Sequence, residues 1–192
     1  MFIPWQQRKE LGIVRSFILT SLELLKNPVH FFDTLQTSES RGGEILFASI
    51  SYTIGFLINF AYMFILRQEP LISKGKLLIS FPLILLFTIL LINVIALIMH
   101  SFLTIITSQH YSFEKTLQVA LYTFGASQLF QIIPFFGSFI GTFFMVIFII
   151  LGLTTIHKIK YYQSVTVTVL PFILLSVLFL YMWTLVKDQF QI

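Results

Sequence analysis

The sequence predicts an all-α, polytopic membrane protein, in which a five-helix transmembrane bundle is preceded by an interfacial amphipathic helix. Only 10% of the 192 residues are charged, whereas a soluble domain carries about 25%. In addition, 57% of the residues are hydrophobic and 23 are Phe, so the chain could not cover a globule with a polar shell. The apolar residues also form runs of about 20, the length that crosses a bilayer.

Five apolar stretches match or approach the length of a membrane-spanning helix, and none contains Asp, Glu, Lys or Arg. They are Ile45–Leu66, Leu77–Met99, Leu117–Ile133, Phe136–Ile156 and Val165–Val186. The second continues to Thr107, which predicts a helix that emerges near His100 or tilts strongly. The third is short and is followed at once by Pro134, so the third and fourth are expected to form a tight helical hairpin. Residues 45–186 are then one membrane domain, with an interfacial segment at 1–44 and a tail at 187–192.

The segment ahead of these stretches is amphipathic rather than uniformly apolar. Apolar side chains recur at helical spacing and polar ones fall on another face, which predicts a helix in the membrane interface. The apolar members are Leu11, Val14, Ile18, Leu22 and Leu25, and the polar members are Ser16, Thr20, Glu23 and Asn27. Asn27 and Pro28 are expected to end this helix and to start a shorter one over Val29–Leu35, with Asn27 as N-cap. The polar run 37–43 predicts a hinge.

The basic residues lie in the amino-terminal segment and in the predicted loops. The net charge of +4 therefore suits lipid headgroups and control of topology rather than a nucleic acid. With the amino terminus inside, eight Lys and Arg residues fall on the inner side and four on the outer side. Because short cytosolic loops are enriched in Lys and Arg, this bias predicts a cytosolic amino terminus. The four outer residues are Arg67, Lys74, Lys76 and Lys187.

The titratable residues show no pattern typical of an enzyme or a metal centre. All eight Asp and Glu residues lie outside the predicted spans, and the chain has no Cys. His100 and Ser101 are adjacent on one helix and therefore do not face each other. No His-x-x-His or His-x-x-x-His pair occurs, although the fold could bring His100, His110 and His157 together at the inner face. We interpret the histidines as interfacial side chains and expect no catalysis, no metal and no cofactor.

The third predicted span carries polar side chains that need partners inside the membrane. An unpaired amide is costly in hydrocarbon, so these residues are expected to face other helices or a hydrated cavity. Two interpretations stay open: hydrogen bonds between helices, or a groove for a lipid headgroup or small solute. The residues on this candidate polar face are Gln118, Tyr122, Gln128 and Gln131, with the lone amides Asn59 and Asn93 as partners.

Small residues and prolines indicate where helices pack or bend. Gly137 and Gly141 form a GxxxG pattern at the start of the fourth stretch, which lets two backbones approach closely. The pattern serves either packing against the third stretch, through the hairpin at Pro134, or association of two copies. Pro171 lies inside the fifth stretch and is expected to kink it.

An ordered series of short motifs resembles a known membrane family. The strings are SFEKTLQVALYTFG (112–125), IIPFFGSFIG (132–141), LGLTTIHKI (151–159) and VTVLP (167–171), and PVHFF (28–32) stands ahead of them. In this order they resemble the Yip domain family, whose members are named for interaction with Ypt/Rab GTPases in eukaryotes and are widespread in prokaryotes. The resemblance implies a five-span bundle with a cytosolic amino terminus, and it supplies no catalytic residues.

The amino-terminal region is short and basic and lacks the aromatic and acidic motifs of the eukaryotic branch. This favours the prokaryotic branch and a bacterial inner (plasma) membrane. We therefore expect a non-enzymatic accessory subunit of a transport, efflux or lipid-handling complex. Its expected contacts are membrane lipids and a membrane-protein partner or a second copy of the chain, without nucleic acid. The alternative is a lipid or small-solute conduit in its own right.

Overall fold

The computed structural model describes residues 3–35, 42–65, 74–171, 173, 174 and 177, and within them the chain is helical, without strands. The amino-terminal part contains three helices, and four longer α-helices and one short 3-10 helix follow. The elements are α1 (Arg8–Leu11), α2 (Ile13–Lys26), α3 (Pro28–Asp33), α4 (Gly42–Ile65), α5 (Lys74–Thr107), α6 (Phe113–Gln128), the 3-10 helix η1 (Leu129–Ile132) and α7 (Gly137–His157). A further helical stretch covers residues 161–171.

Among the described residues, three helices are long and apolar enough to cross a membrane: Gly42–Ile65, Gly75–Thr107 and Gly137–His157. They correspond to the first, second and fourth predicted spans. α5 is a single helix of 34 residues, or about 51 Å at 1.5 Å per residue, and so exceeds the hydrocarbon thickness, as its sequence predicts. The third predicted span is a helix of only 16 residues. The fifth lies mostly outside the described residues, so the count of five stays a prediction.

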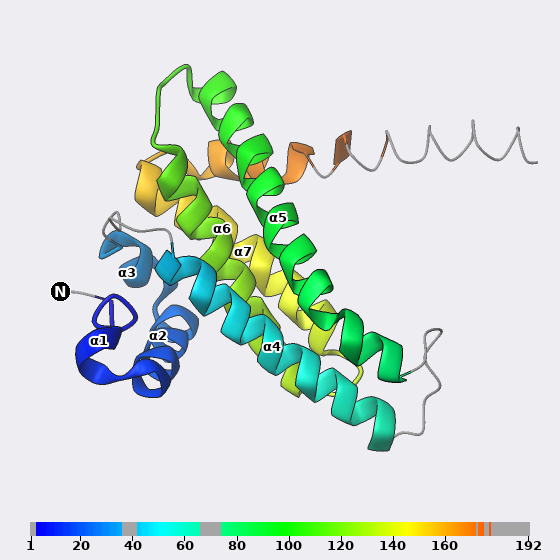
Figure 1. The fold of residues 1–192 in the computed structure, drawn as a ribbon. Coiled ribbons are helices and arrows are strands. Elements are labelled where there is room, and N and C mark those ends of the chain that lie inside the picture. Colours follow the sequence, from blue (N-terminus) through cyan, green and yellow to red (C-terminus); the bar gives the residue numbers. More distant parts are fainter. Residues whose placement is uncertain (1–2, 36–41, 66–73, 172, 175–176, 178–192) are drawn as a thin grey trace, which may run out of the picture.

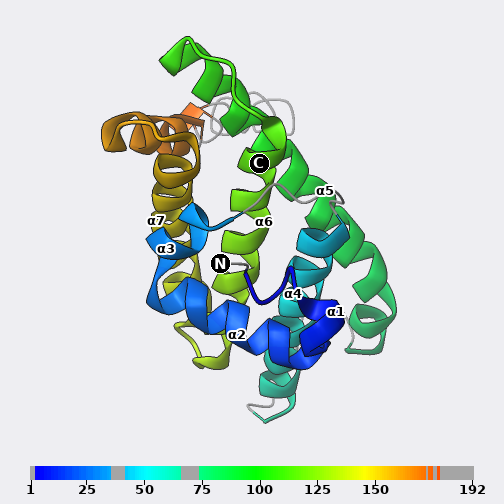
Figure 2. The same cartoon turned by 90° about the vertical axis from the view of Figure 1, so that its left-hand side faces the viewer.

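α6 lies at the centre of the molecule, with α4, α5 and α7 around it (Figures 1 and 2). Eleven of its 16 residues are buried, which is unusual for a helix of a small bundle and explains its mixed composition. A helix that faces protein on most sides can carry Thr, Ser and Gln, because neighbouring helices rather than lipid surround them. The central position of α6 therefore makes it the element on which polar side chains gather.

α6 and α7 form the tight hairpin that the sequence predicts. Pro134 lies in the connection between η1 and α7, where Phe135 adopts a left-handed conformation with φ of 64°. A Cβ on Gly137 would clash with the Phe130 carbonyl oxygen, and one on Gly141 would meet the Ser127 carbonyl oxygen at 2.6 Å. Both glycines thus lie in close contact with α6 and η1 of the same chain. Packing against the third stretch is the first of the two uses predicted for the GxxxG pattern.

The amino-terminal helices cover one side of the bundle (Figure 2). α2 lies where the amphipathic helix was predicted, but its buried and exposed faces differ from the predicted ones. Ser16 and Thr20 are fully buried against the protein, whereas the sequence places them on the polar face. The exposed side chains of α2 include five apolar ones, Ile13, Val14, Ile18, Leu19 and Leu22, as well as the basic Arg15 and Lys26. The predicted location in the membrane interface stays a prediction.

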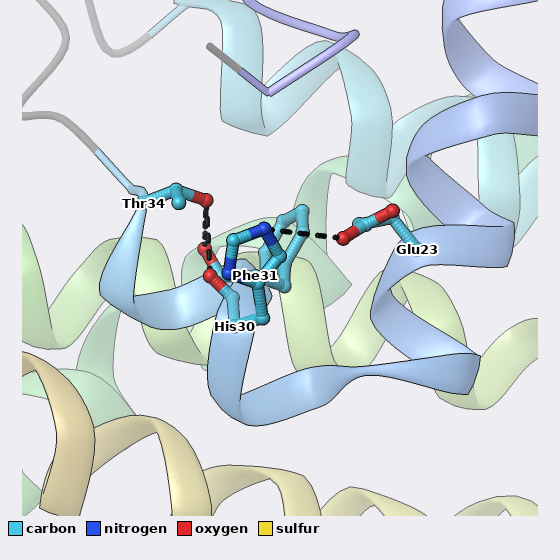
Figure 3. A network of polar contacts seen from close by, with 4 residues as sticks. All are labelled: Glu23, His30, Phe31 and Thr34. Atoms are coloured by element: carbon cyan, nitrogen blue, oxygen red, sulfur yellow. Dashed lines mark hydrogen bonds and ion pairs between the residues drawn. The ribbon is translucent and has the colours of Figure 1, made fainter. Parts of the chain in front are cut away.

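The turn between α2 and α3 also differs in one detail from the prediction. Pro28 occupies the first turn of α3, but the side chain of Asn27 forms no cap hydrogen bond. Figure 3 shows polar contacts of α3: at the end of this helix, Thr34 Oγ1 donates to the carbonyls of His30 (3.0 Å) and Phe31 (3.1 Å). His30 Nε2 also lies 3.9 Å from Glu23 Oε1. Such an exposed pair contributes at most about 1 kcal/mol, so the buried ring of Phe31 anchors α3 more firmly.

The stretch 161–171 lies across the end of the bundle rather than along α7 (orange in Figure 1). Its buried Ser164 donates a hydrogen bond of 2.7 Å to the Ile150 carbonyl in α7. Pro171 is buried at the end of this stretch. The kink predicted at Pro171 involves residues that follow it, most of which are outside the described ranges.

Candidate functional site

The polar residues predicted as one face of α6 separate into groups that contact different neighbours. Gln118 and Tyr122 face α4 and the amino-terminal helices, whereas Gln128 and Gln131 lie toward the α6–α7 connection. Ten positions at about 100° per residue turn Gln128 about 80° away from Gln118. The sequence therefore identified the helix that carries these polar residues. The prediction was wrong in assigning residues from two sides of that helix to a single face.

The first group is built around a buried carboxylate that sequence reasoning missed. Glu44 is 2% exposed, and its Oε1 accepts a hydrogen bond of 3.0 Å from Gln118 Nε2. Glu44 lies in the first turn of α4 because that helix begins three residues before the predicted span. Its Oε2 and the Tyr122 hydroxyl are buried without a hydrogen-bond partner among the described residues. Unpaired buried polar atoms are destabilising, which marks this group as an unusual feature of the core.

Aromatic rings from the amino-terminal segment close over this group. Trp5 is fully buried, and its Nε1 donates a hydrogen bond of 2.6 Å to the Gly43 carbonyl. Its ring packs edge-on against Phe47, which in turn contacts Tyr122. Arg8 lies against Gly43, close enough that a Cβ there would be 2.9 Å from Arg8 Nη1. The segment before α2 is thus part of the core, and its basic side chain lies beside the residue that precedes Glu44.

The second group joins α4, η1 and α7 by amide and hydroxyl hydrogen bonds. Gln131 Oε1 accepts from Asn59 Nδ2 at 3.0 Å and from Ser138 Oγ at 3.1 Å. Asn59 and Gln131 thus form a hydrogen bond between α4 and η1. Such bonds are one of the two uses predicted for these side chains. Asn93 is different, because its amide donates to the Ile89 carbonyl of its own helix at 2.8 Å. Asn93 therefore does not contribute to this group.

Beside the second group lies a cavity of about 270 Å³ between α5, α6 and α7. One part of its wall is apolar, with Leu91, Ile92 and Ile95 from α5. The rest includes amides and hydroxyls, and among the residues that the structure describes no Asp, Glu, Lys, Arg or His belongs to the lining. The polar lining residues are Thr88, Ser127, Gln128, Gln131, Ser138 and Thr142. An apolar cavity with a few convergent polar groups is the usual form of a small-molecule site, so this cavity is the candidate functional site.

His100 and His157 both contact Thr116, near the amino-terminal end of α6. Thr116 Oγ1 lies 3.2 Å from His100 Nδ1 and 3.0 Å from His157 Nε2, so one buried hydroxyl links α5, α6 and α7. His110 is exposed and His30 pairs with Glu23. Within the described part of the chain, no three His, Cys, Asp or Glu side chains are grouped as a metal would require. The His100–Thr116–His157 chain therefore connects three helix ends.

The described part of the chain is helical and contains three helices able to cross a bilayer, which makes the protein an α-helical integral membrane protein. The chain belongs to the Yip1 domain family, whose model matches residues 22–184. The resemblance read from the ordered motifs is thereby confirmed, while the prokaryotic branch stays a prediction. The match begins within α2, so Trp5 and Arg8 precede it. No curated protein and no solved structure matches the chain.

Proposed function

We propose that this Yip1 family member is a non-enzymatic membrane protein that assists a membrane complex through lipid handling, and that it binds a lipid between α5, α6 and α7. The observation that carries the proposal is the cavity of about 270 Å³ with its apolar wall and its amide and hydroxyl groups. Ligand sites have volumes of about 300–1,000 Å³. The cavity is slightly smaller than this range, so it would hold only the head region of a lipid, whose chains extend into the bilayer.

Exposure of the cavity rim supports access from the bilayer. Leu91 in α5 is 46% exposed, and Ser138 and Thr142 in α7 are also exposed. All three line the cavity and belong to helices long and apolar enough to cross a membrane. Lipid is therefore the molecule with the shortest path to the cavity.

The proposal is tested by native mass spectrometry of the tagged protein released gently from its own membranes. We expect a retained lipid, together with a stoichiometric membrane-protein partner. Replacing Ile92 with Trp would fill the cavity, and this variant should lose the lipid. The control Leu57→Trp adds the same ring at a site of α4 that is 52% exposed. Equal lipid retention in both variants would contradict the proposal.

Gln128 favours a second function, a conduit for a lipid or small solute. Its amide lines the cavity, and its Nε2 makes only a long contact of 3.4 Å with Ser127 Oγ. It is therefore available to a moving ligand. A conduit predicts that Gln128→Leu abolishes transbilayer movement of a fluorescent lipid in vesicles while the fold is kept. Movement at the normal rate in that variant, or none with the unchanged chain, would count against a conduit.

A further inference from the structure

The hydroxyl groups in the wall of the cavity offer acceptors rather than donors. Three of them donate to carbonyls of their own helices: Thr88 to Ile84 at 2.8 Å, Ser127 to Phe124 at 2.7 Å, and Thr142 to Ser138 at 2.8 Å. The hydroxyl of Ser138 donates to the Gln131 side chain at 3.1 Å. Since each hydroxyl has a single proton, only their oxygen lone pairs remain for a ligand.

The two amides of the lining supply the donors. The carbonyl oxygen of Gln131 already accepts two hydrogen bonds, from Asn59 and Ser138, so its NH₂ group is the part that a ligand can use. Gln128 holds its NH₂ group only loosely, at 3.4 Å from Ser127 Oγ. The wall therefore combines hydroxyl acceptors with amide donors, close to one another and without a formal charge.

These hydroxyl acceptors and amide donors suit some lipid headgroups better than others. A phosphate monoester is anionic and accepts hydrogen bonds, so it would meet hydroxyl lone pairs with no Lys or Arg among the lining residues to neutralise it. Desolvating such a charge without a partner is strongly unfavourable. An uncharged head with one free hydroxyl and a neighbouring ester carbonyl fits both kinds of group, because the hydroxyl donates and the carbonyl accepts.

We infer that the cavity between α5, α6 and α7 selects an uncharged lipid whose head carries a free hydroxyl beside an ester carbonyl, diacylglycerol being the simplest example. The inference rests on the proposed lipid-binding function and names the ligand class for it. The hydroxyl donates to the oxygen of Thr142, the ester carbonyl accepts from the amide of Gln128, and the acyl chains lie along the apolar wall at Leu91, Ile92 and Ile95.

The experiment uses the full chain in phosphatidylcholine vesicles that contain one of two photoactivatable probes. The probes are a diacylglycerol and a phosphatidic acid with identical diazirine-labelled acyl chains, so that they differ only in the phosphate. After illumination, crosslinked peptides from α5, α6 and α7 are quantified by mass spectrometry. We expect at least about fivefold more crosslinking with diacylglycerol, the ratio that one hydrogen bond supports, and competition by unlabelled diacylglycerol.

Two variants connect the preference to named groups. Thr142→Val keeps the shape of the side chain and removes an acceptor oxygen, and Gln128→Leu removes the amide. Each should lower crosslinking of diacylglycerol by about fivefold. The control is Thr53→Val in α4, whose hydroxyl likewise donates to its own helix, to Ser49 at 2.7 Å, but which does not line the cavity.

The outcomes separate the inference from the function on which it rests. Equal or stronger crosslinking by phosphatidic acid at the cavity would overturn the selectivity and leave lipid binding in place. Specific crosslinking by neither probe would overturn lipid binding itself. A preference for diacylglycerol that both cavity variants retain would show that other residues set it and would refute the assignment to Gln128 and Thr142.

Discussion

At the scale of single residues, Gly141 fixes the distance between α6 and α7. A Cβ there would approach the Ser127 carbonyl oxygen to 2.6 Å, and a backbone atom cannot move aside as a flexible side chain does. We expect Gly141→Ala to destabilise the fold by about 1–3 kcal/mol through overpacking. Thermal unfolding in detergent, followed by circular dichroism, measures this change.

The matched control for that substitution is Gly75→Ala at the start of α5. A Cβ at this position meets nothing within 4 Å, and Ala favours a helix over Gly by up to about 1 kcal/mol. The control should therefore keep or raise the unfolding temperature. If both variants behaved alike, close packing at Gly141 would not be the cause.

Glu44 and Gln118 are the second residue-scale test, because they form one buried pair. Gln118→Leu removes the donor to Glu44 Oε1, 3.0 Å away, and should cost about 1–3 kcal/mol, since a buried acceptor loses its partner. Glu44→Leu combined with Gln118→Leu replaces both groups by apolar ones and should recover much of that loss. Unfolding of the four chains of this double-mutant cycle gives the coupling energy. Additive losses would show that the pair is not coupled.

At the scale of elements, α2 presents an apolar row to its surroundings. Val14 is 73% exposed and Ile18 is 50% exposed, a pattern that favours contact with lipid. Because the chain has no Cys, Ile18→Cys provides a single labelling site for a fluorophore. We expect brominated lipids to quench that fluorophore strongly, since the predicted interfacial position of α2 would place position 18 in the bilayer.

The control for this quenching experiment is Lys26→Cys at the end of the same helix. Lys26 is exposed and charged, and a label there should be quenched more weakly because it lies in water or among headgroups. Equal quenching at the two positions would contradict an interfacial α2.

The elements also show where sequence reasoning succeeds and where it stops. Long apolar runs predicted α4, α5 and α7, and Pro134 located the hairpin, because these features depend on local composition. The buried side of α2 was not predictable in this way. Ser16 and Ser21 donate hydrogen bonds to carbonyls of their own helix, at 3.0 and 2.8 Å, and a hydroxyl satisfied in this manner can be buried. A polar residue in a helix therefore does not identify the face that meets water.

The candidate site was predictable only in part, for a related reason. Gln131 and Asn59 stood out because amides are rare in apolar runs, and they do pair. Glu44 did not stand out, because it borders an apolar run and only the fold shows that Trp5 covers this end of α4. Thr88 and Thr142 are ordinary residues of membrane helices. Their place in the cavity depends on how three helices pack, which is tertiary information.

At the scale of the whole molecule, α5 determines which loops share a side of the membrane. It runs from Lys74 to Thr107, so Lys76 and Gln109 lie near opposite ends of a helix of about 51 Å. With a cytosolic amino terminus, Lys76 is outside and Gln109 is inside. A membrane-impermeant maleimide should label Lys76→Cys in intact cells. It should label Gln109→Cys only after the cells are opened, and the reverse result would invert the predicted orientation.

The central place of α6 has a consequence for how distant parts of the chain communicate. On one side of α6, Tyr122 contacts the rings of Phe31 and Phe47. On another side, Gln128 borders the cavity. A ligand that shifted α6 would therefore change how well the amino-terminal segment docks. Thermodynamic linkage is reciprocal, so a partner that pulled this segment away would change the affinity of the cavity by the same factor. Ligand binding in the cavity and docking of the amino-terminal segment, at two different sides of α6, would then be thermodynamically coupled.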